Sequence, residues 1–184
     1  ADMWAEDTSI DRNGDGMLQF VEFMGEPNNP EAIARTQYSE ETAIALGVPL
    51  EAVLEDPIVA NWDTAQAKER MTATWAAHPE IEVVFCNNDD MAMAAARAAK
   101  GNAAYAKTIF VGFDGIQSAC NAILAGEKTM SVAQEAYDMG YKAVEAAVKA
   151  VNGETLEKFI DSGCSVVTKD NAQERLDKLK GYIG

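Results

Sequence analysis

Oxygen-bearing side chains alternate along a short stretch near the start of the chain. Asp11, Asn13 and Asp15 occupy every second position, which is the spacing that a tight loop needs to wrap one hard cation. Gly16 follows where the backbone must turn sharply, and Met17 stands where a main-chain carbonyl would be the ligand. Together these residue types predict a calcium-binding loop.

The residues after the loop decide how such a site is completed. Gln19 can add a side-chain oxygen, and Glu22 falls at the twelfth position, where a helix–loop–helix calcium site places a bidentate carboxylate. An outgoing helix does not fit, because Pro27 and Pro30 would break it within about two turns. The apolar run Leu18–Met24 instead predicts a buried strand, so the last ligand should come from a distant residue.

Strand-like runs and helical segments alternate along the chain. Helix starts are indicated by a capping side chain at Asn29 before Pro30, and at Asp63 before Thr64. Strands separated by helices of about 10–15 residues form βαβ units, which predicts an α/β fold with a mainly parallel sheet. We expect strands at 18–24, 50–55, 81–86, 108–113 and 129–133, and helices starting near residues 30, 64, 90, 115 and 137.

Polar residues follow several of the expected strands. Asn87, Asn88 and Asp89 come after one strand, Asp114 after the next, and Gln134 after the last. In open parallel sheets, ligands bind at the carboxyl ends of the strands. We therefore expect these residues to form a polar rim around a binding site.

The composition excludes several classes of protein. The formal net charge of −15 argues against nucleic acid or an anionic membrane as the partner. The apolar runs are shorter than the roughly 20 residues of a membrane span. Three well-separated cysteines and the single histidine, His78, offer neither a zinc site nor a Cys–His nucleophile. The acidic start without methionine leads us to expect a processed or truncated chain.

Four longer motifs make the sequence resemble the galactose/glucose-binding proteins of bacterial sugar ABC transporters. After Gln134 the resemblance rests mostly on the order of the elements. The motifs are Asp11–Val21 (DRNGDGMLQFV), Gly25–Thr36 (GEPNNPEAIART), Trp62–Lys68 (WDTAQAK) and Ile81–Met93 (IEVVFCNNDDMAM).

The resemblance implies a type I periplasmic binding fold, in which a sugar is held between two lobes. Residues 1–135 would form one lobe, a three-layer doubly wound sheet, and residues 136–184 a hinge crossing and the remnant of a mostly missing second lobe. Glu82 would supply the last carboxylate of a structural calcium site, with Glu22 either the alternative ligand or a solvent-facing strand residue. The implied metal ligands are Asp11, Asn13, Asp15, Met17, Gln19 and Glu82.

The resemblance also implies the sugar contacts. Amides, carboxylates and a guanidinium can bracket adjacent hydroxyls, and an indole covers the apolar face of a pyranose. Asn29 and Glu31 stand where the family commonly has a histidine and an aspartate, and Gln134 stands where an asparagine is usual. The resemblance therefore does not determine which sugar is bound. The implied contacts are Asn29, Glu31, Arg35, Trp62, Asn88, Asp114 and Gln134.

The function implied by the resemblance is not enzymatic. The parent protein would bind a glucose- or galactose-type monosaccharide for an ABC transporter permease, in the periplasm or as an extracellular membrane-anchored lipoprotein, with a chemoreceptor as a further possible partner. A single lobe leaves half of the sugar in water, so this chain alone should bind weakly. The alternatives are a calcium-binding module, which lacks its second helix here, and the effector domain of a sugar-responsive regulator, which needs a basic DNA-binding headpiece.

The segment 137–151 carries an apolar stripe at helical spacing. A complete second lobe would cover this stripe. In its absence we expect residues 136–184 to pair with another copy, to repack on their own lobe or to meet an N-terminal fragment. The stripe consists of Met139, Ala143, Val144, Ala147, Val148 and Val151.

Overall fold

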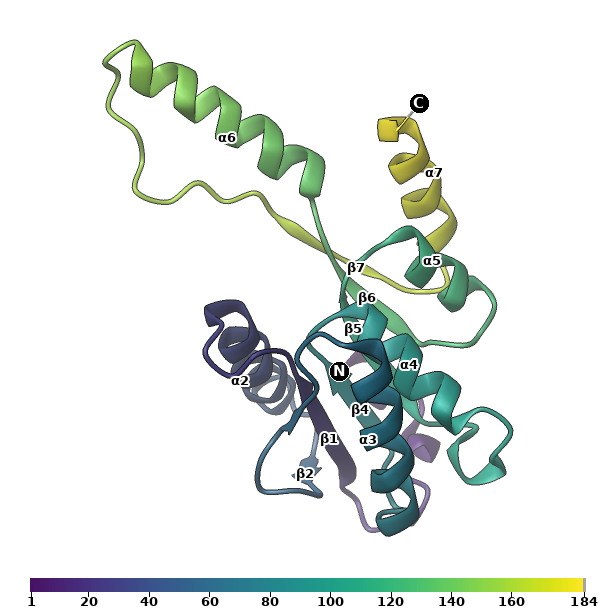
Figure 1. The fold of residues 1–184 in the computed structure, drawn as a ribbon. Coiled ribbons are helices and arrows are strands. Elements are labelled where there is room, and N and C mark those ends of the chain that lie inside the picture. Colours follow the sequence, from purple (N-terminus) through teal and green to yellow (C-terminus); the bar gives the residue numbers. More distant parts are fainter. Residues whose placement is uncertain (184) are drawn as a thin grey trace.

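The computed structural model describes residues 1–183 and contains one seven-stranded sheet with helices on both faces (Figure 1). The strand order is β2-β1-β4-β5-β6-β7, and β3 pairs with the end of β1. All pairs are parallel except β6 with β7, which confirms the expected α/β fold with a mainly parallel sheet. The strands are β1 (Leu18–Met24), β2 (Leu50–Ala52), β3 (Ile58–Val59), β4 (Val83–Cys86), β5 (Ile109–Asp114), β6 (Met130–Gln134) and β7 (Cys164–Val167).

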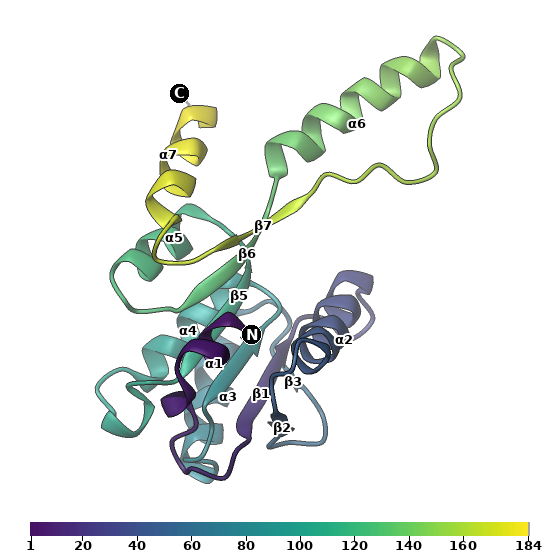
Figure 2. The ribbon, with the colours of Figure 1, turned by 180° about the vertical axis from the view of Figure 1, so that it is seen from behind.

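Helices form a layer on each face of the sheet. Figure 1 shows α3 and α4 in front of the sheet, and the reverse view in Figure 2 shows α1 and α2 on the opposite face. Two short 3-10 turns, η1 (Thr8–Ile10) and η2 (Ala103–Tyr105), lie in the connections. The helices are α1 (Asp2–Glu6), α2 (Pro30–Ala45), α3 (Thr64–Ala77), α4 (Asp89–Ala99), α5 (Gln117–Leu124), α6 (Ala136–Val151) and α7 (Ala172–Ile183).

The neighbouring strands β1 and β4 have side chains packed on both of their faces. Phe23 and Val84 pack with α3 and α4, whereas Phe20 and Val83 pack with η1 and the α1–α2 side. Successive side chains of a strand point to opposite faces, so a strand between two helical layers is apolar on both. All seven residues of β1 are buried for this reason.

The helix starts follow the capping residues. The Asn29 side chain accepts a hydrogen bond from the Ala32 N–H at 3.0 Å, and Asp63 accepts one from the Gln66 N–H at 2.7 Å. These caps confirm two of the expected helix starts. Asn88 caps α4 in the same way, so that helix begins at Asp89.

Several elements differ from the expected ones. The strand expected at 50–55 ends early, because β2 covers only Leu50–Ala52. The short strand β3 was not expected; it follows Pro57, which cannot donate a ladder hydrogen bond. Neither β7 nor α7 was expected. Three of the four residues of β7 are exposed, so the strand lacks the apolar run that would reveal it.

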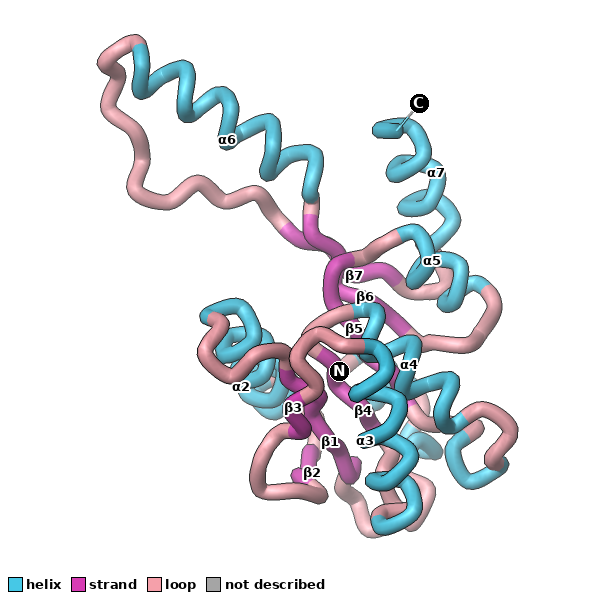
Figure 3. The backbone as a smooth tube through the Cα atoms, viewed as in Figure 1, coloured by secondary structure: helices cyan, strands magenta, loops and turns pink. Residues whose placement is uncertain are grey.

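The C-terminal residues divide into two parts. Residues 136–163 extend away from the sheet: α6 has no buried side chain, and the loop after it runs back beside the helix to β7 (Figure 3). Residues 164–183 return, because β7 pairs with β6 and because Leu176 of α7 packs in one cluster with Cys120 of α5 and Val167 of β7. The expectation that all of residues 136–184 leave the first lobe is therefore wrong for β7 and α7.

The apolar stripe of α6 does not repack on its own lobe, so that alternative was wrong. Met139, Val144 and Val148 are 44%, 66% and 55% exposed. Tyr137 at the helix start stacks on Tyr182 of α7 with ring centroids 4.6 Å apart, and the rest of the helix extends into solvent. Pairing with another copy or with an N-terminal fragment stays a prediction. Within residues 1–183, no helix combines the length and the apolar character that crossing a bilayer requires.

Candidate functional site

Side chains from three elements converge on one carboxylate at the carboxyl edge of the sheet. Arg35 of α2 lies with Nη1 3.3 Å from Oδ1 of Asp114, the last residue of β5. Gln134, the last residue of β6, donates from Nε2 to the same oxygen at 2.6 Å. Parallel strands end at one edge, which brings residues separated by up to 99 positions into one cluster.

Asp114 is held in an unusual conformation at this edge. Residues other than glycine rarely adopt its backbone φ of 116°, so the surrounding structure must hold Asp114 in this conformation. Burial raises its pKa above the ordinary value, and the charge of Arg35 and the hydrogen bond from Gln134 oppose that shift. The side chain keeps 27% exposure, so the carboxylate can also accept hydrogen bonds from a ligand.

Two aromatic rings flank Arg35. Its guanidinium carbon lies 3.9 Å from the ring centroid of Phe113 and 5.8 Å from that of Trp62. The indole of Trp62 lies so close to Gly25 that a Cβ at this glycine would overlap the ring. Trp62 is only partly buried, so it can present an apolar surface beside the polar cluster.

The remaining implied sugar residues lie at helix N-termini on the same edge. Asn29 and Asn88 cap α2 and α4 with their side-chain oxygens. Glu31 is exposed in the first turn of α2. In the described part of the chain, these three make no side-chain hydrogen bond to the Arg35–Asp114–Gln134 cluster.

A buried ion pair lies beneath the cluster. Asp89 and Lys128 have side chains with 0% exposure, and the Lys128 ammonium donates to Asp89 Oδ1. Asp89 also accepts from Ser131 Oγ at 2.7 Å and from the Gly115 N–H at 2.8 Å. Asp89 therefore ties α4 to the ends of β5 and β6, and the expectation that it lines the rim is wrong because it does not reach the surface.

The expectation that Asn87 lines the rim is also wrong, because this residue is 1% exposed, and Phe113 was not expected at the site. Asn87 is buried, its carbonyl accepts from Arg35 Nη1 at 2.7 Å, and its side-chain oxygen accepts from the Gly25 N–H at 3.1 Å. Phe113 stacks on Arg35. The available signal for Asn87 was the pair of consecutive asparagines after an apolar run. Successive side chains at a strand end point in opposite directions, so the two asparagines have different surroundings.

The predicted calcium loop is wound around its own carboxylates. Asp11 accepts hydrogen bonds from the N–H groups of Gly14 at 2.6 Å and Gly16 at 2.8 Å. Both glycines have positive φ, 75° and 86°, which only glycine adopts readily. The residue types at these positions therefore fix the turn locally.

The other loop ligands contact one another. Asp15 Oδ2 accepts from Asn13 Nδ2 at 2.8 Å and from Gln19 Nε2 at 2.9 Å. The Met17 N–H donates to the second oxygen of Asp15 at 2.8 Å, and this hydrogen bond is the main reason why the pKa of Asp15 lies below its ordinary value.

Glu82, and not Glu22, lies against the loop. Glu82 is 1% exposed, and its carboxylate accepts from the N–H groups of Arg12 and, at 3.3 Å, Gln19. Glu22 faces α2 instead, where its carboxyl contacts Ser39, and it is 8% exposed. The alternative that Glu22 completes the metal site therefore has no geometric support, and the alternative that it faces solvent is wrong.

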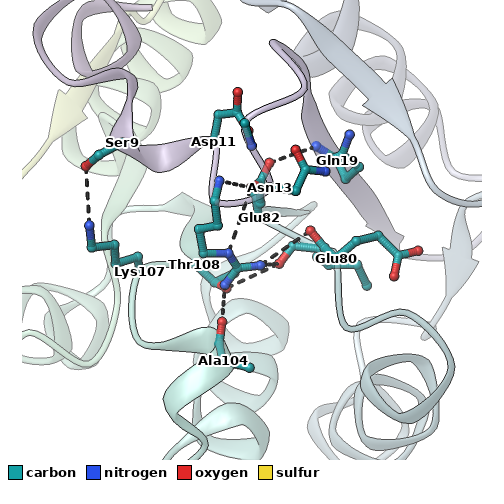
Figure 4. Close-up of polar contacts among 12 residues, drawn as sticks. Ser9, Asp11, Asn13, Gln19, Glu80, Glu82, Ala104, Lys107 and Thr108 are labelled. Atoms are coloured by element: carbon teal, nitrogen blue, oxygen red, sulfur yellow. Dashed lines mark hydrogen bonds and ion pairs between the residues drawn. The ribbon is translucent and has the colours of Figure 1, made fainter.

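The Arg12 side chain fixes the loop to the body of the protein. Its guanidinium donates to the carbonyls of Ile81 and Ala104, to Glu80 O at 3.3 Å and to Thr108 Oγ1 at 3.1 Å; Figure 4 shows Glu80, Ala104 and Thr108 around this group. Its Nε lies 3.8 Å from Glu82. The loop is thus attached to the body of the protein in two ways: the Arg12 N–H donates to Glu82, and the Arg12 guanidinium donates to the groups named above.

The donor chemistry of this region fits calcium. Carboxylates of Asp11, Asp15 and Glu82 and amide oxygens of Asn13 and Gln19 offer oxygen alone, which hard cations prefer. Within residues 1–183, however, no three side chains of His, Cys, Asp or Glu are grouped closely enough to hold a metal ion. Their oxygens are instead engaged with loop amides and with Arg12.

Residues 3–155 match the periplasmic binding protein domain. The chain is 32% identical over 157 residues to the D-galactose/methyl-galactoside binding periplasmic protein of Haemophilus influenzae, covering 84% of this chain and 46% of that protein. It is 34% identical over 162 residues to a putative rhizopine-binding protein of Rhizobium meliloti, covering 87% and 52%.

Among solved structures, an ABC transporter solute-binding protein of Bacillus halodurans C-125 with bound myo-inositol superimposes with a TM-score of 0.78. It is 27% identical, and the match covers 93% of this chain and 58% of that one. The chain spans about half the length of the curated relatives it matches. These relatives are binding proteins, which confirms the expectation of a protein that is not an enzyme. The chain belongs to the family of periplasmic binding protein domains.

Proposed function

We propose that the protein binds a monosaccharide of the glucose or galactose type outside the cytoplasmic membrane and delivers it to an ABC transporter permease. The observation that carries this proposal is the convergence of Arg35, Asp114 and Gln134 beside the partly exposed ring of Trp62. The family of the chain supports it. A periplasmic location, or a lipoprotein on the outer side of the membrane, follows from the same function.

The cluster has the chemistry that a sugar requires. A hydroxyl both donates and accepts, so it can donate to Asp114 while it accepts from Arg35. These two charged groups lie 3.3 Å apart and can contact one hydroxyl or two neighbouring ones. Trp62 would cover the C–H face of the ring by burial of apolar surface.

The named relatives support a ring that carries hydroxyls on most of its carbons. One is named for D-galactose and methyl-galactoside, and a solved neighbour holds myo-inositol. Both ligands are six-membered rings with several hydroxyl groups. This size and chemistry agree with the proposed hexose of the glucose or galactose type.

The described lobe would contact the ligand from one side only. Its cluster lies at an open sheet edge, and binding sites usually bury most of the surface of a ligand of this size. The exposed apolar side chains of α6 provide a surface for a second lobe, whose closure over the sugar would be the state that the permease recognises. Binding by this chain alone should therefore be weak, and a chemoreceptor as a further partner stays a prediction.

The proposal is tested by titrating the isotope-labelled chain with galactose, glucose, ribose and myo-inositol while recording backbone amide shifts by NMR. We expect millimolar binding with shifts confined to the residues around Asp114, and loss of binding in Asp114→Ala. Asp177→Ala, which changes an exposed aspartate of α7, is the matched control. Binding that Asp114→Ala leaves unchanged would place the ligand elsewhere.

We further propose that the loop Asp11–Gln19 and Glu82 hold a structural calcium ion. When bound, calcium would neutralise the carboxylates of Asp11, Asp15 and Glu82 and join the loop to the residue before β4. At a calcium concentration of 100 times Kd, it would stabilise the fold by about 2.7 kcal/mol. The support is the oxygen-only donor set and the position of buried Glu82 beside the loop.

The calcium proposal is tested by thermal unfolding with calcium and with chelator. The melting temperature should rise with calcium in the parent chain and in Asp177→Ala, and should respond little in Asp15→Ala. An equal response in all three chains would contradict the site.

A further inference from the structure

A buried carboxyl lies beneath the sugar cluster without a basic partner. Glu22 on β1 is 8% exposed, and its two oxygens lie 2.9 Å from Ser39 Oγ and 2.9 Å from Asn87 Nδ2. Among the ion pairs of residues 1–183, none includes Glu22. A buried carboxylate without a cation is costly, so the neutral form is favoured here.

The hydrogen bonds around Ser39 agree with a neutral Glu22. The Ser39 hydroxyl has one proton, yet its oxygen lies 3.0 Å from the Thr36 carbonyl and 2.9 Å from Glu22 Oε2. If the hydroxyl donates to Thr36, a protonated Glu22 can donate to Ser39, and both contacts are satisfied. Burial raises the pKa of Glu22 to about 8 and outweighs the hydrogen bonds from Ser39 and Asn87, which by themselves lower the pKa.

Asn87 connects Glu22 to the sugar cluster. Its side-chain amide donates to Glu22, and its side-chain oxygen accepts from the N–H of Gly25, the glycine on which Trp62 rests. Its main-chain carbonyl accepts from Arg35 at 2.7 Å. Asn87 therefore contacts both Arg35 and Gly25, the glycine beneath Trp62, and Glu22 accepts a hydrogen bond from Asn87.

We propose that Glu22 is a positioning residue of the sugar site, and that it positions Asn87, and through it Arg35 and Trp62, only while its carboxyl is neutral. Ionisation of Glu22 in mildly alkaline solution would leave a buried charge without a cation. The carboxylate would then move toward water, and that movement would break its hydrogen bond with Asn87. Sugar binding would then weaken as the pH rises. This inference rests on the sugar-binding function proposed above.

The other charged groups around Glu22 do not account for such a change. Glu40 on α2 lies near enough to raise the pKa of Glu22 further. Burial holds the pKa of Cys86 on β4 well above its ordinary value, so its thiol stays neutral in this range. Arg35 pairs with Asp114 and not with Glu22. Asp114 lies beyond Arg35, and burial raises its pKa while the charge of Arg35 and the hydrogen bond from Gln134 oppose that shift.

The experiment is an NMR titration between pH 6 and pH 9.5 of the full 184-residue chain and of Glu22→Gln, a neutral residue of the same length. Glu69→Gln, which changes an exposed glutamate of α3, is the control. It records the side-chain carbon of Glu22, the Asn87 amide and the apparent affinity for galactose and myo-inositol. If only the neutral form binds, the affinity of the parent chain and of the control should fall about tenfold between pH 7 and pH 9. Glu22→Gln should bind equally at both pH values.

Two results would overturn the inference. One is a Glu22 carboxyl that titrates in the ordinary acid range, and the other is an affinity of Glu22→Gln that falls with pH as in the parent chain. If neither sugar binds at any pH, the proposed function fails instead. The Asn87 amide then still tests the positioning role, because it should shift with the Glu22 titration in the parent chain and stay fixed in Glu22→Gln.

Discussion

The loop at Asp11–Gln19 and the Arg35–Asp114–Gln134 cluster are both polar, but they are assembled in different ways. Asp11, Asn13 and Asp15 bond to groups within six positions along the chain. Arg35, Asp114 and Gln134 come from α2, β5 and β6 and meet only because three elements end at one edge. The loop thus depends on local turn chemistry, whereas the cluster depends on the whole sheet. Changes to long-range contacts should therefore cost more than changes to local ones.

The largest effect is expected at the buried ion pair beneath the cluster. Lys128→Ala leaves Asp89 as a buried charge without its partner, which should lower the free energy of unfolding by about 3–5 kcal/mol. Lys100→Ala, which removes a lysine from an exposed pair with Glu127, should cost less than about 1 kcal/mol. Urea unfolding measures both. Equal costs would mean that the sheet does not depend on the Asp89–Lys128 pair.

The next effect is a pH dependence of stability caused by Glu22. The pKa of Glu22 is about 8 in the folded protein against 4.5 for the ordinary group, so between these values the folded state holds a proton that the unfolded state has lost. The free energy of unfolding should therefore fall as the pH rises, by up to about 1.4 kcal/mol per unit. Urea unfolding of the parent chain and Glu22→Gln at pH 5.5, 6.5 and 7.5 should show the difference in slope, and parallel slopes would count against it.

A smaller effect is expected where the loop is attached to the body. Arg12→Ala removes the guanidinium contacts with Ile81, Ala104 and Thr108 and should cost about 2 kcal/mol. It should also make the melting temperature more dependent on calcium, because less of the chain then holds the loop in place. The exposed Arg70 of α3 provides the control. If Arg12→Ala were as stable as Arg70→Ala, the contacts of the Arg12 guanidinium would not contribute to the attachment of the loop.

The smallest effect is expected for a purely local contact. Asp63 caps α3 by one hydrogen bond to the Gln66 N–H, so Asp63→Ala should cost about 1 kcal/mol. Asp56→Ala, in the exposed turn before β3, should be close to neutral. If thermal unfolding showed a larger loss of stability for Asp63→Ala than for Lys128→Ala, the expectation that long-range contacts contribute more than local ones would be wrong.

Much of the fold followed from patterns that are local in the chain. The run Leu18–Met24 predicted β1 with its observed bounds, and the caps at Asn29 and Asp63 predicted two helix starts. The strand β7 was not predicted, because it pairs with β6 through its main chain while three of its four residues are exposed. Main-chain pairing leaves no signature in residue type, so such a strand is visible only in the folded sheet.

The amino-acid sequence by itself determined the turn at Gly14 and Gly16, the apolar strands and the residue types at the carboxyl edge, because these depend on propensity, spacing and side-chain chemistry. Only the tertiary structure decided that Glu82 rather than Glu22 faces the loop, that Asp89 is buried with Lys128, and that α7 returns to the first lobe. The reason is that burial and pairing depend on which distant element covers a residue, and that is decided by the packing of the whole sheet.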